Sequence, residues 1–119
     1  MVRVTLVALL ITLVVSCSRG DRSAVVIQES TRYEASLFRQ NCAICHGPEA
    51  QGRTLDDGRQ VPNLRAGEHK YTTAGKIRQH ITDGGNGMVP FRDQLTQREI
   101  DMLVDFVMND LRQGNGGNQ

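Results

Sequence analysis

The strongest hydrophobic periodicity lies near the carboxyl end of the chain, where it predicts an amphipathic helix. The residues of its apolar stripe are Ile100, Leu103, Val104, Val107 and Leu111. Just before the stripe, Thr96 and Glu99 have the three-residue spacing of a capping box, in which each side chain bonds the other residue's backbone N–H. Leu95 precedes this box and can pair with Ile100 as a hydrophobic staple. These signals mark the start of the helix.

Two weaker patterns predict two further helices. The first begins with Thr31 and Glu34 at capping-box spacing. Its face continues with Leu37, Phe38, Asn41 and Cys42. The second can be capped by Thr72 or Thr73 and is expected to end at the Gly-Gly pair that follows residue 83. Its apolar side comprises Ala74, Ile77 and Ile81.

No segment alternates between polar and apolar residues as a half-buried strand does. Residues 47–70 contain Gly, Pro, Asp and Asn without a clear period. A structureless stretch of this length is uncommon in a compact domain unless it serves a site or wraps something. The predicted fold class is therefore all-α, with one long connection between the first two helices.

The amino terminus has the pattern of an export signal. Residues 4–15 form an apolar run after Arg3, and a run of about 12 residues is shorter than the roughly 20 that a membrane-spanning helix needs. A signal peptide over residues 1–16 is therefore predicted. The run ends in Leu13-Val14-Val15-Ser16-Cys17, which resembles the bacterial lipoprotein processing box, so Cys17 is the expected lipidation site. An ordinary secretory signal with an incidental cysteine is the alternative.

The rest of the chain is expected to divide into three parts. Residues 17–30 are predicted to be the lipidated cysteine and a flexible tether, with a short strand over residues 25–27 as the alternative. Residues 31–113 form the one folded domain, and the Gly/Asn-rich residues 114–119 form a disordered tail. These predictions describe an exported lipoprotein that is anchored to a membrane and faces the periplasm, with Ser18 favouring the outer membrane.

Composition narrows the function classes. The chain has 119 residues, enough for one domain, and its 14 basic and 13 acidic side chains give a formal charge of +1. Because a nucleic-acid-binding surface needs clustered excess Lys and Arg, no nucleic-acid partner is expected. The chain has no Trp and only three Cys, which cannot supply a disulfide framework. A core this small is therefore expected to need another stabilising group.

The candidate chemistry is the motif Cys42-Ala43-Ile44-Cys45-His46, the pattern for covalent attachment of a c-type haem. Residues three apart share a helix face, so both sulfurs can reach the two vinyl groups on one porphyrin edge. The next residue, His46, can then bind the iron through one imidazole nitrogen. One haem c attached through Cys42 and Cys45 is the predicted cofactor, and it would also enlarge the small core.

Three other interpretations of the motif remain open. A redox-active Cys-x-x-Cys dithiol is one, although it usually belongs to a βαβ unit that is not predicted here. A zinc site completed by His46 with His69 or His80 is the second, although adjacent Cys45 and His46 would chelate one zinc awkwardly. A structural disulfide of an exported protein is the third.

The second axial position of the iron has several candidates. Met88 lies in a glycine-rich loop that ends in proline, where a methionine has no helix face to pack on. A thioether there favours ferrous iron and raises the reduction potential. Met102 and Met108 lie on the last helix, where methionine more often fills a core. The remaining candidates are His69, expected on the solvent side of a loop, His80, expected half-exposed on a helix, and an open position.

Taken in order, these motifs resemble the class I monohaem cytochromes c, over nearly all of residues 31–113. The resemblance implies an all-α fold in which the first and last helices cross around one haem, with Phe38 packed against Leu103 and Phe106. Pro62-Asn63-Leu64 matches the Pro-x-Leu element of that family. This implies that Pro62 and Leu64 belong to the haem site and that the Pro62 carbonyl accepts a hydrogen bond from His46. The loop around Met88 resembles the family's axial-methionine loop.

The function expected from these features is one-electron transfer by a haem with His46 and Met88 as ligands, without a catalytic residue. The setting would be a respiratory or dehydrogenase chain on the periplasmic side, either as a free carrier or as a subunit of an oxidoreductase complex. Its partners would be redox proteins (an oxidase, a reductase or a dehydrogenase), met transiently by a monomeric domain. The alternative is a five-coordinate haem enzyme or a protein that binds a gas or peroxide.

Overall fold

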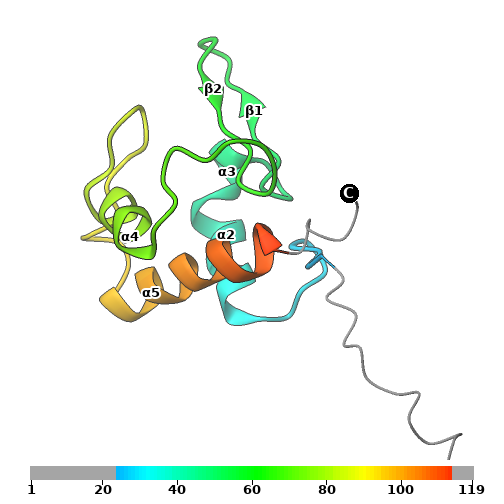
Figure 1. The fold of residues 1–119 in the computed structure, drawn as a ribbon, viewed down its shortest axis with the longest axis vertical. Coiled ribbons are helices and arrows are strands. Elements are labelled where there is room, and N and C mark those ends of the chain that lie inside the picture. Colours follow the sequence, from blue (N-terminus) through cyan, green and yellow to red (C-terminus); the bar gives the residue numbers. More distant parts are fainter. Residues whose placement is uncertain (1–23, 114–119) are drawn as a thin grey trace, which may run out of the picture.

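The structure is a computed structural model, and it describes residues 24–113. Its helices are α2 (Tyr33–Asn41), α3 (Ala43–His46), α4 (Ala74–Asp83) and α5 (Gln97–Asp105), and α5 continues directly as the π-helix η1 (Phe106–Leu111). Two short strands, β1 (Arg53–Thr54) and β2 (Gln60–Val61), lie between α3 and α4. In Figure 1, α5 passes across α2, and the two strands project away from the helices.

The two strands correct the all-α prediction. They pair antiparallel, with Arg53 opposite Val61 and Thr54 opposite Gln60, within the stretch predicted to be an irregular loop. Strands of two residues are too short for any alternation of polar and apolar residues to be visible in the sequence. The fold is therefore helical with one small hairpin.

The first and last helices pack through aromatic side chains. The Phe38 and Phe106 rings lie 6.3 Å apart between centroids and are tilted by 58°, an arrangement that aromatic pairs favour. Leu103 is buried beside them, as the family resemblance implies. The other residues of the predicted terminal stripe (Ile100, Val104, Val107 and Leu111) are also buried. The predicted stripe is confirmed.

Two of the predicted helix caps are present. The Thr96 hydroxyl accepts the Glu99 backbone N–H while the Glu99 carboxylate accepts the Thr96 N–H, which completes the capping box of α5. The Thr73 hydroxyl accepts a backbone N–H at the start of α4, and Gly84 ends that helix with a φ of +71°. Ile77 and Ile81 are buried as predicted, whereas Ala74 is exposed.

The capping box predicted at Thr31 is wrong. Helix α2 begins after Arg32, and no side chain caps it. Arg32 holds the Glu34 carboxylate and also donates to both oxygens of Asp110, at 2.8 and 2.9 Å. Glu34 is therefore engaged by a guanidinium that links the start of α2 to η1, and it does not turn back to Thr31.

Residues 24–30 pack on the domain, so the prediction of a flexible tether is wrong for this part of it. Ile27 is fully buried. The Glu49 carboxylate accepts the Ile27 and Gln28 backbone N–H groups at 2.8 and 2.9 Å. Arg65 donates to the Val25 carbonyl at 2.8 Å and also pairs with Glu49. The apolar side chain and these long-range hydrogen bonds together hold the segment.

Other predictions fall on residues that the structure does not describe. The signal peptide over residues 1–16, the lipidated Cys17 and the tail over residues 114–119 all lie outside the described range. Within residues 24–113, no helix combines the length and the apolar character needed to cross a bilayer.

Candidate functional site

The Cys-x-x-Cys-His motif lies on one helical turn that follows α2. The Cys45 and His46 N–H groups both bond the Cys42 carbonyl, at 3.1 and 2.9 Å, while the Cys42 N–H bonds the last turn of α2 through Phe38. Cys42 and Cys45, three residues apart, therefore share one side of this turn. The turn continues a helix whose Phe38 packs in the core, so its position is fixed by the packing of α2 against α5.

The two cysteines differ in their surroundings. Cys42 is half-buried against the core and Cys45 is exposed, and the structure gives both as free thiols. Burial, with Cys45 as a smaller cause, raises the pKa of the Cys42 thiol to about 12. A redox-active dithiol needs a cysteine with a lowered pKa, so the surroundings of Cys42 do not favour that interpretation.

The His46 imidazole is largely buried and has an unpaired nitrogen. Its Nδ1 is buried without a hydrogen-bond partner. Burial lowers the pKa of His46, the Pro62 backbone carbonyl raises it, and the charge of His80 lowers it further. The Pro62 carbonyl therefore lies near the ring without an aligned hydrogen bond to Nδ1. Nδ1 is therefore the nitrogen that can donate to Pro62, which leaves Nε2, the other ring nitrogen, to bind a metal.

Gly52 brings the Pro-x-Leu element close to this histidine. The Gly52 N–H bonds the His46 carbonyl at 2.8 Å. A Cβ at Gly52 would lie 2.5 Å from the Val61 carbonyl oxygen and 2.8 Å from the Pro62 carbonyl carbon, and φ at this glycine is +75°. Only glycine allows so close an approach. The Leu64 N–H then bonds back to the loop after α3, so Pro62 and Leu64 are held beside the motif.

Met88 lies on a tight turn after α4. Gly85 and Met88 exchange two backbone hydrogen bonds, at 2.9 and 3.0 Å, and the two residues between them, Asn86 and Gly87, have φ values of +51° and +85°. Positive φ at both central positions is typical of a type I′ turn, which favours Asn-Gly. The turn presents Met88 half-buried against the core, while the next residue, Val89, is exposed.

The other candidate ligands have different neighbours. The His80 ring packs on the Tyr71 ring, 4.7 Å between centroids, and its charge influences His46. His69 is half-buried on its loop, where burial lowers its pKa. The Met108 sulfur accepts a hydrogen bond from the Arg112 Nη1, at 3.6 Å. His69 is therefore less exposed than the sequence suggested, whereas His80 is half-exposed as expected, and its charge acts on His46.

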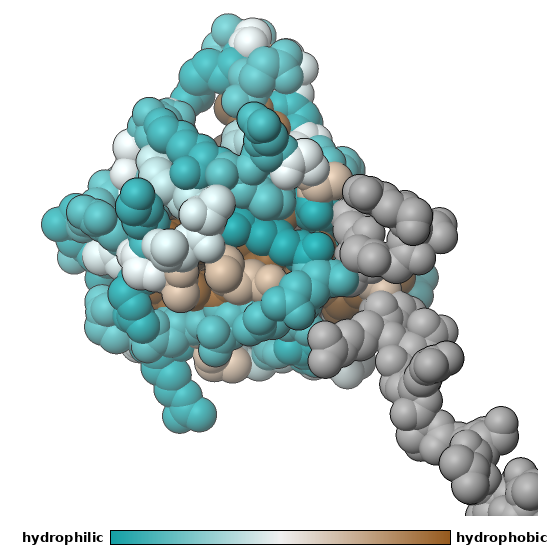
Figure 2. Space-filling model, viewed as in Figure 1, coloured by the Kyte–Doolittle hydropathy of each residue, from teal (hydrophilic) through white to brown (hydrophobic). Residues whose placement is uncertain are grey.

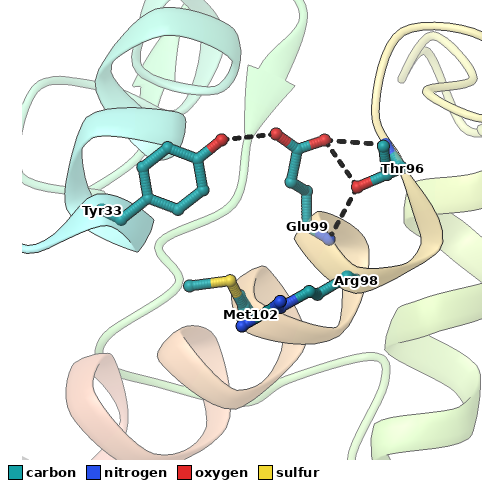
Figure 3. A pocket seen from close by; sticks show the side chains of 5 residues that line it. All are labelled: Tyr33, Thr96, Arg98, Glu99 and Met102. Atoms are coloured by element: carbon teal, nitrogen blue, oxygen red, sulfur yellow. Dashed lines mark hydrogen bonds between the residues drawn. The ribbon is translucent and has the colours of Figure 1, made fainter.

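Met102 belongs to a separate surface pocket of about 450 Å³. Its lining residues are Tyr33, Thr96, Arg98, Glu99 and Met102. In Figure 3, the Tyr33 hydroxyl donates to the Glu99 carboxylate at 2.6 Å, and that carboxylate also bonds Thr96. The pocket therefore surrounds the capping box of α5 and contains no residue of the Cys-x-x-Cys-His motif.

These residues fit a covalently attached haem. Three of the predicted site residues pack against the core and stay partly exposed: Cys42, Leu64 and Met88. Partly exposed apolar side chains of this kind are expected at the edge of an apolar binding site. The second ring nitrogen of His46 and the Met88 thioether are the groups that could hold the iron. Figure 2 shows apolar surface in a recess on this face, surrounded by hydrophilic side chains. Within residues 24–113, no three His, Cys, Asp or Glu side chains gather as a zinc site requires.

Comparison with known proteins supports this assignment. A family model described as cytochrome C oxidase, cbb3-type, subunit III matches residues 30–107, a region that includes every predicted site residue except Cys17. The chain is 35% identical over 86 residues to the Cbb3-type cytochrome c oxidase subunit FixP of Sinorhizobium medicae (strain WSM419). That match covers 63% of this chain but only 28% of FixP, so the chain spans little more than a quarter of that relative.

A solved structure shows the same fold. The KustC0563 c-type cytochrome superposes with a TM-score of 0.56 at 28% sequence identity, over 65% of this chain and 95% of that protein. The small hairpin and the helical arrangement described above are therefore compatible with the architecture of a c-type cytochrome.

Proposed function

The chain belongs to the cytochrome c oxidase cbb3-type subunit III family, and on that premise we propose that it carries single electrons through one haem bound by Cys42, Cys45, His46 and Met88. Members of this cytochrome family carry covalently bound c-type haem. Such a haem supplies an iron that takes up and releases one electron. The observation that carries the proposal is the helical turn of the motif, on which both cysteines and a largely buried histidine follow one another within five residues.

Each site residue has a separate task. The two thiols would hold the haem by adding to its vinyl groups to form thioethers, and His46 and Met88 would hold the iron. A neutral thioether at Met88 would raise the reduction potential of that iron. The Pro62 carbonyl, already near His46, is to accept the other imidazole N–H and fix the orientation of the ring. Leu64 supplies apolar contact at the edge of the site.

The proposed setting is the periplasmic side of a bacterial membrane. The signal peptide would direct export, the lipidated Cys17 would anchor the domain, and Ser18 favours the outer membrane. The relative FixP is named as an oxidase subunit, which supports redox proteins as partners. Whether this chain works within an oxidase complex or as a separate monomeric carrier would be decided by which proteins copurify with it from membranes.

The test of the ligand set is optical spectroscopy of the full chain, expressed with haem-attachment machinery. We expect a sharp low-spin reduced spectrum and the weak far-red band that sulfur bound to ferric iron gives. Met88→Ala should abolish this band, lower the reduction potential and admit carbon monoxide to the reduced protein. Met102→Ala, which alters a methionine of the separate α5 pocket, should change none of these properties.

The other outcomes point to specific errors. A far-red band that persists in Met88→Ala would show that Met88 is not the ligand. A Met88→Ala protein that loses the band but stays low-spin would mean that another side chain, His80, has replaced the thioether on the iron. The double variant Met88→Ala/His80→Ala should then have an open iron position. Rapid carbon monoxide binding by the unmutated protein would overturn the carrier function in favour of a five-coordinate haem protein.

A further inference from the structure

One side chain connects the hairpin to the turn that bears Met88. Arg59, in the connection between β1 and β2, donates from Nη1 to the Gly87 carbonyl at 3.1 Å. The two residues are 28 positions apart, and Gly87 directly precedes Met88. Figure 1 shows the hairpin and the loop after α4 on the same side of the helices. The guanidinium therefore joins the hairpin to the turn that bears Met88.

Contacts within the hairpin also hold the Arg59 guanidinium. The Asp57 carboxylate accepts the Arg59 backbone N–H at 3.0 Å and its Nε–H at 2.7 Å. The Leu55 N–H bonds the Arg59 carbonyl at 2.9 Å, which closes the end of the hairpin. Because backbone and side chain are both fixed, Nη1 is directed at the Gly87 carbonyl without much further loss of rotamer freedom.

Gly87 suits this contact. A Cβ at residue 87 would lie 2.8 Å from the Arg59 Nη1, and φ at this glycine is +85°. Glycine therefore serves the type I′ turn and the approach of Arg59 at once. On the other side of the turn, the Asn86 side-chain amide donates to the Tyr71 hydroxyl at 3.0 Å. The two residues that precede Met88 are thus each held by a different part of the long connection.

We propose that Arg59 is a positioning residue that keeps the Met88 turn closed over the iron. This inference rests on the proposed function, because it takes Met88 to be the axial ligand. When Met88 leaves the iron together with its turn, the movement breaks the Arg59–Gly87 hydrogen bond. Arg59 acts through the backbone of the turn and touches no reacting atom. Since its side chain is about half exposed, its contribution is that of one hydrogen bond from a charged group.

The test uses imidazole as a competing ligand of the ferric, haem-loaded full chain. Imidazole can bind only when Met88 has left, so its apparent affinity reports how often the turn opens. We expect Arg59→Gln to bind imidazole about tenfold more tightly than the unmutated protein, the change expected for one such hydrogen bond. Arg59→Lys, which keeps the charge and can still reach the carbonyl, should give an intermediate affinity.

Arg98→Gln is the matched control. Arg98 carries the same charge and is exposed, but it lies on α5 in the pocket that contains no residue of the motif. Its imidazole affinity should stay within about twofold of the unmutated protein, as should its reduction potential. An Arg59→Gln variant that behaves like Arg98→Gln would overturn the positioning role, provided that Met88→Ala binds imidazole far more tightly. If Met88→Ala and the unmutated protein bind imidazole equally, the ligand assignment itself is wrong.

Discussion

Replacing Ile27 with alanine tests whether the segment before α2 belongs to the folded domain. Ile27 is fully buried, whereas its neighbour Val26 is 49% exposed. The sequence offers no strong pattern here, so the contribution of this segment depends wholly on its packing. Val26→Ala is the natural control, because it removes a similar apolar group from the same segment at the surface.

The expected cost follows from burial. Truncating a buried isoleucine to alanine removes apolar contacts and leaves a cavity, which typically lowers the free energy of unfolding by about 2–5 kcal/mol. Residues 24–30 lie at one end of the described domain, and this segment can detach while the rest stays folded. The loss of unfolding free energy in Ile27→Ala therefore cannot exceed the free energy with which the segment binds the domain. The Glu49 and Arg65 hydrogen bonds to this segment are lost in the same step. We therefore expect about 2–3 kcal/mol for Ile27→Ala and less than about 1 kcal/mol for Val26→Ala.

Urea unfolding of the haem-loaded full chain, followed by circular dichroism, measures both variants. With a slope of about 2 kcal/mol per molar urea, Ile27→Ala should lower the midpoint by about 1–1.5 M. Val26→Ala should lower it by no more than about 0.5 M. Equal midpoints for the two variants would refute the reasoning and would mean that residues 24–30 act as a tether.

The remaining predictions concern one cap and one close backbone approach. Thr96→Ala should lower the free energy of unfolding by about 1 kcal/mol in the same urea assay, because it removes the capping box of α5. The control is Thr72→Ala, which changes an exposed threonine one residue before the α4 cap and should alter the free energy of unfolding by no more than about 0.5 kcal/mol. Gly52→Ala should be the most damaging change of this group, because its Cβ would meet the Val61 carbonyl at 2.5 Å. Gly58→Ala, with a similar φ of +84° and open space around it, should cost only the roughly 1–2 kcal/mol of the left-handed conformation; similar losses for the two glycine variants would contradict the close approach.

Part of the candidate site could be predicted because its signals are local. The motif from Cys42 to His46 specifies its own chemistry through spacing, since a helical turn places residues three apart on one face. Its glycine-rich surroundings favour Met88 over the other two candidate methionines, Met102 and Met108, and the type I′ turn accounts for these glycines. Gly52 was not singled out, because glycine is common in loops and its role depends on a strand residue nine positions later.

The interpretation of the amino-terminal side failed where distant partners decided the outcome. Thr31 and Glu34 have the spacing of a capping box, but Arg32 is paired with Asp110, 78 positions away, and draws Glu34 to itself. Ile27 was placed in a tether because three apolar neighbours in a polar stretch carry little periodic signal. Neither Asp110 nor the core surface that covers Ile27 can be identified from the local sequence.

By itself, the sequence determined the last two helices, their caps at Thr73 and Thr96, and the helical turn that carries the motif. Each of these depends on hydrogen bonds and side-chain contacts within about four residues, which spacing alone specifies. Tertiary structure decided the hairpin, the docking of residues 24–30 and the contact between Arg59 and the Met88 turn. The hairpin strands are too short to leave a pattern in the sequence. The docked segment and the Arg59 contact join residues 22 and 28 positions apart, and their free energy exists only after the helices have packed and brought the partners together.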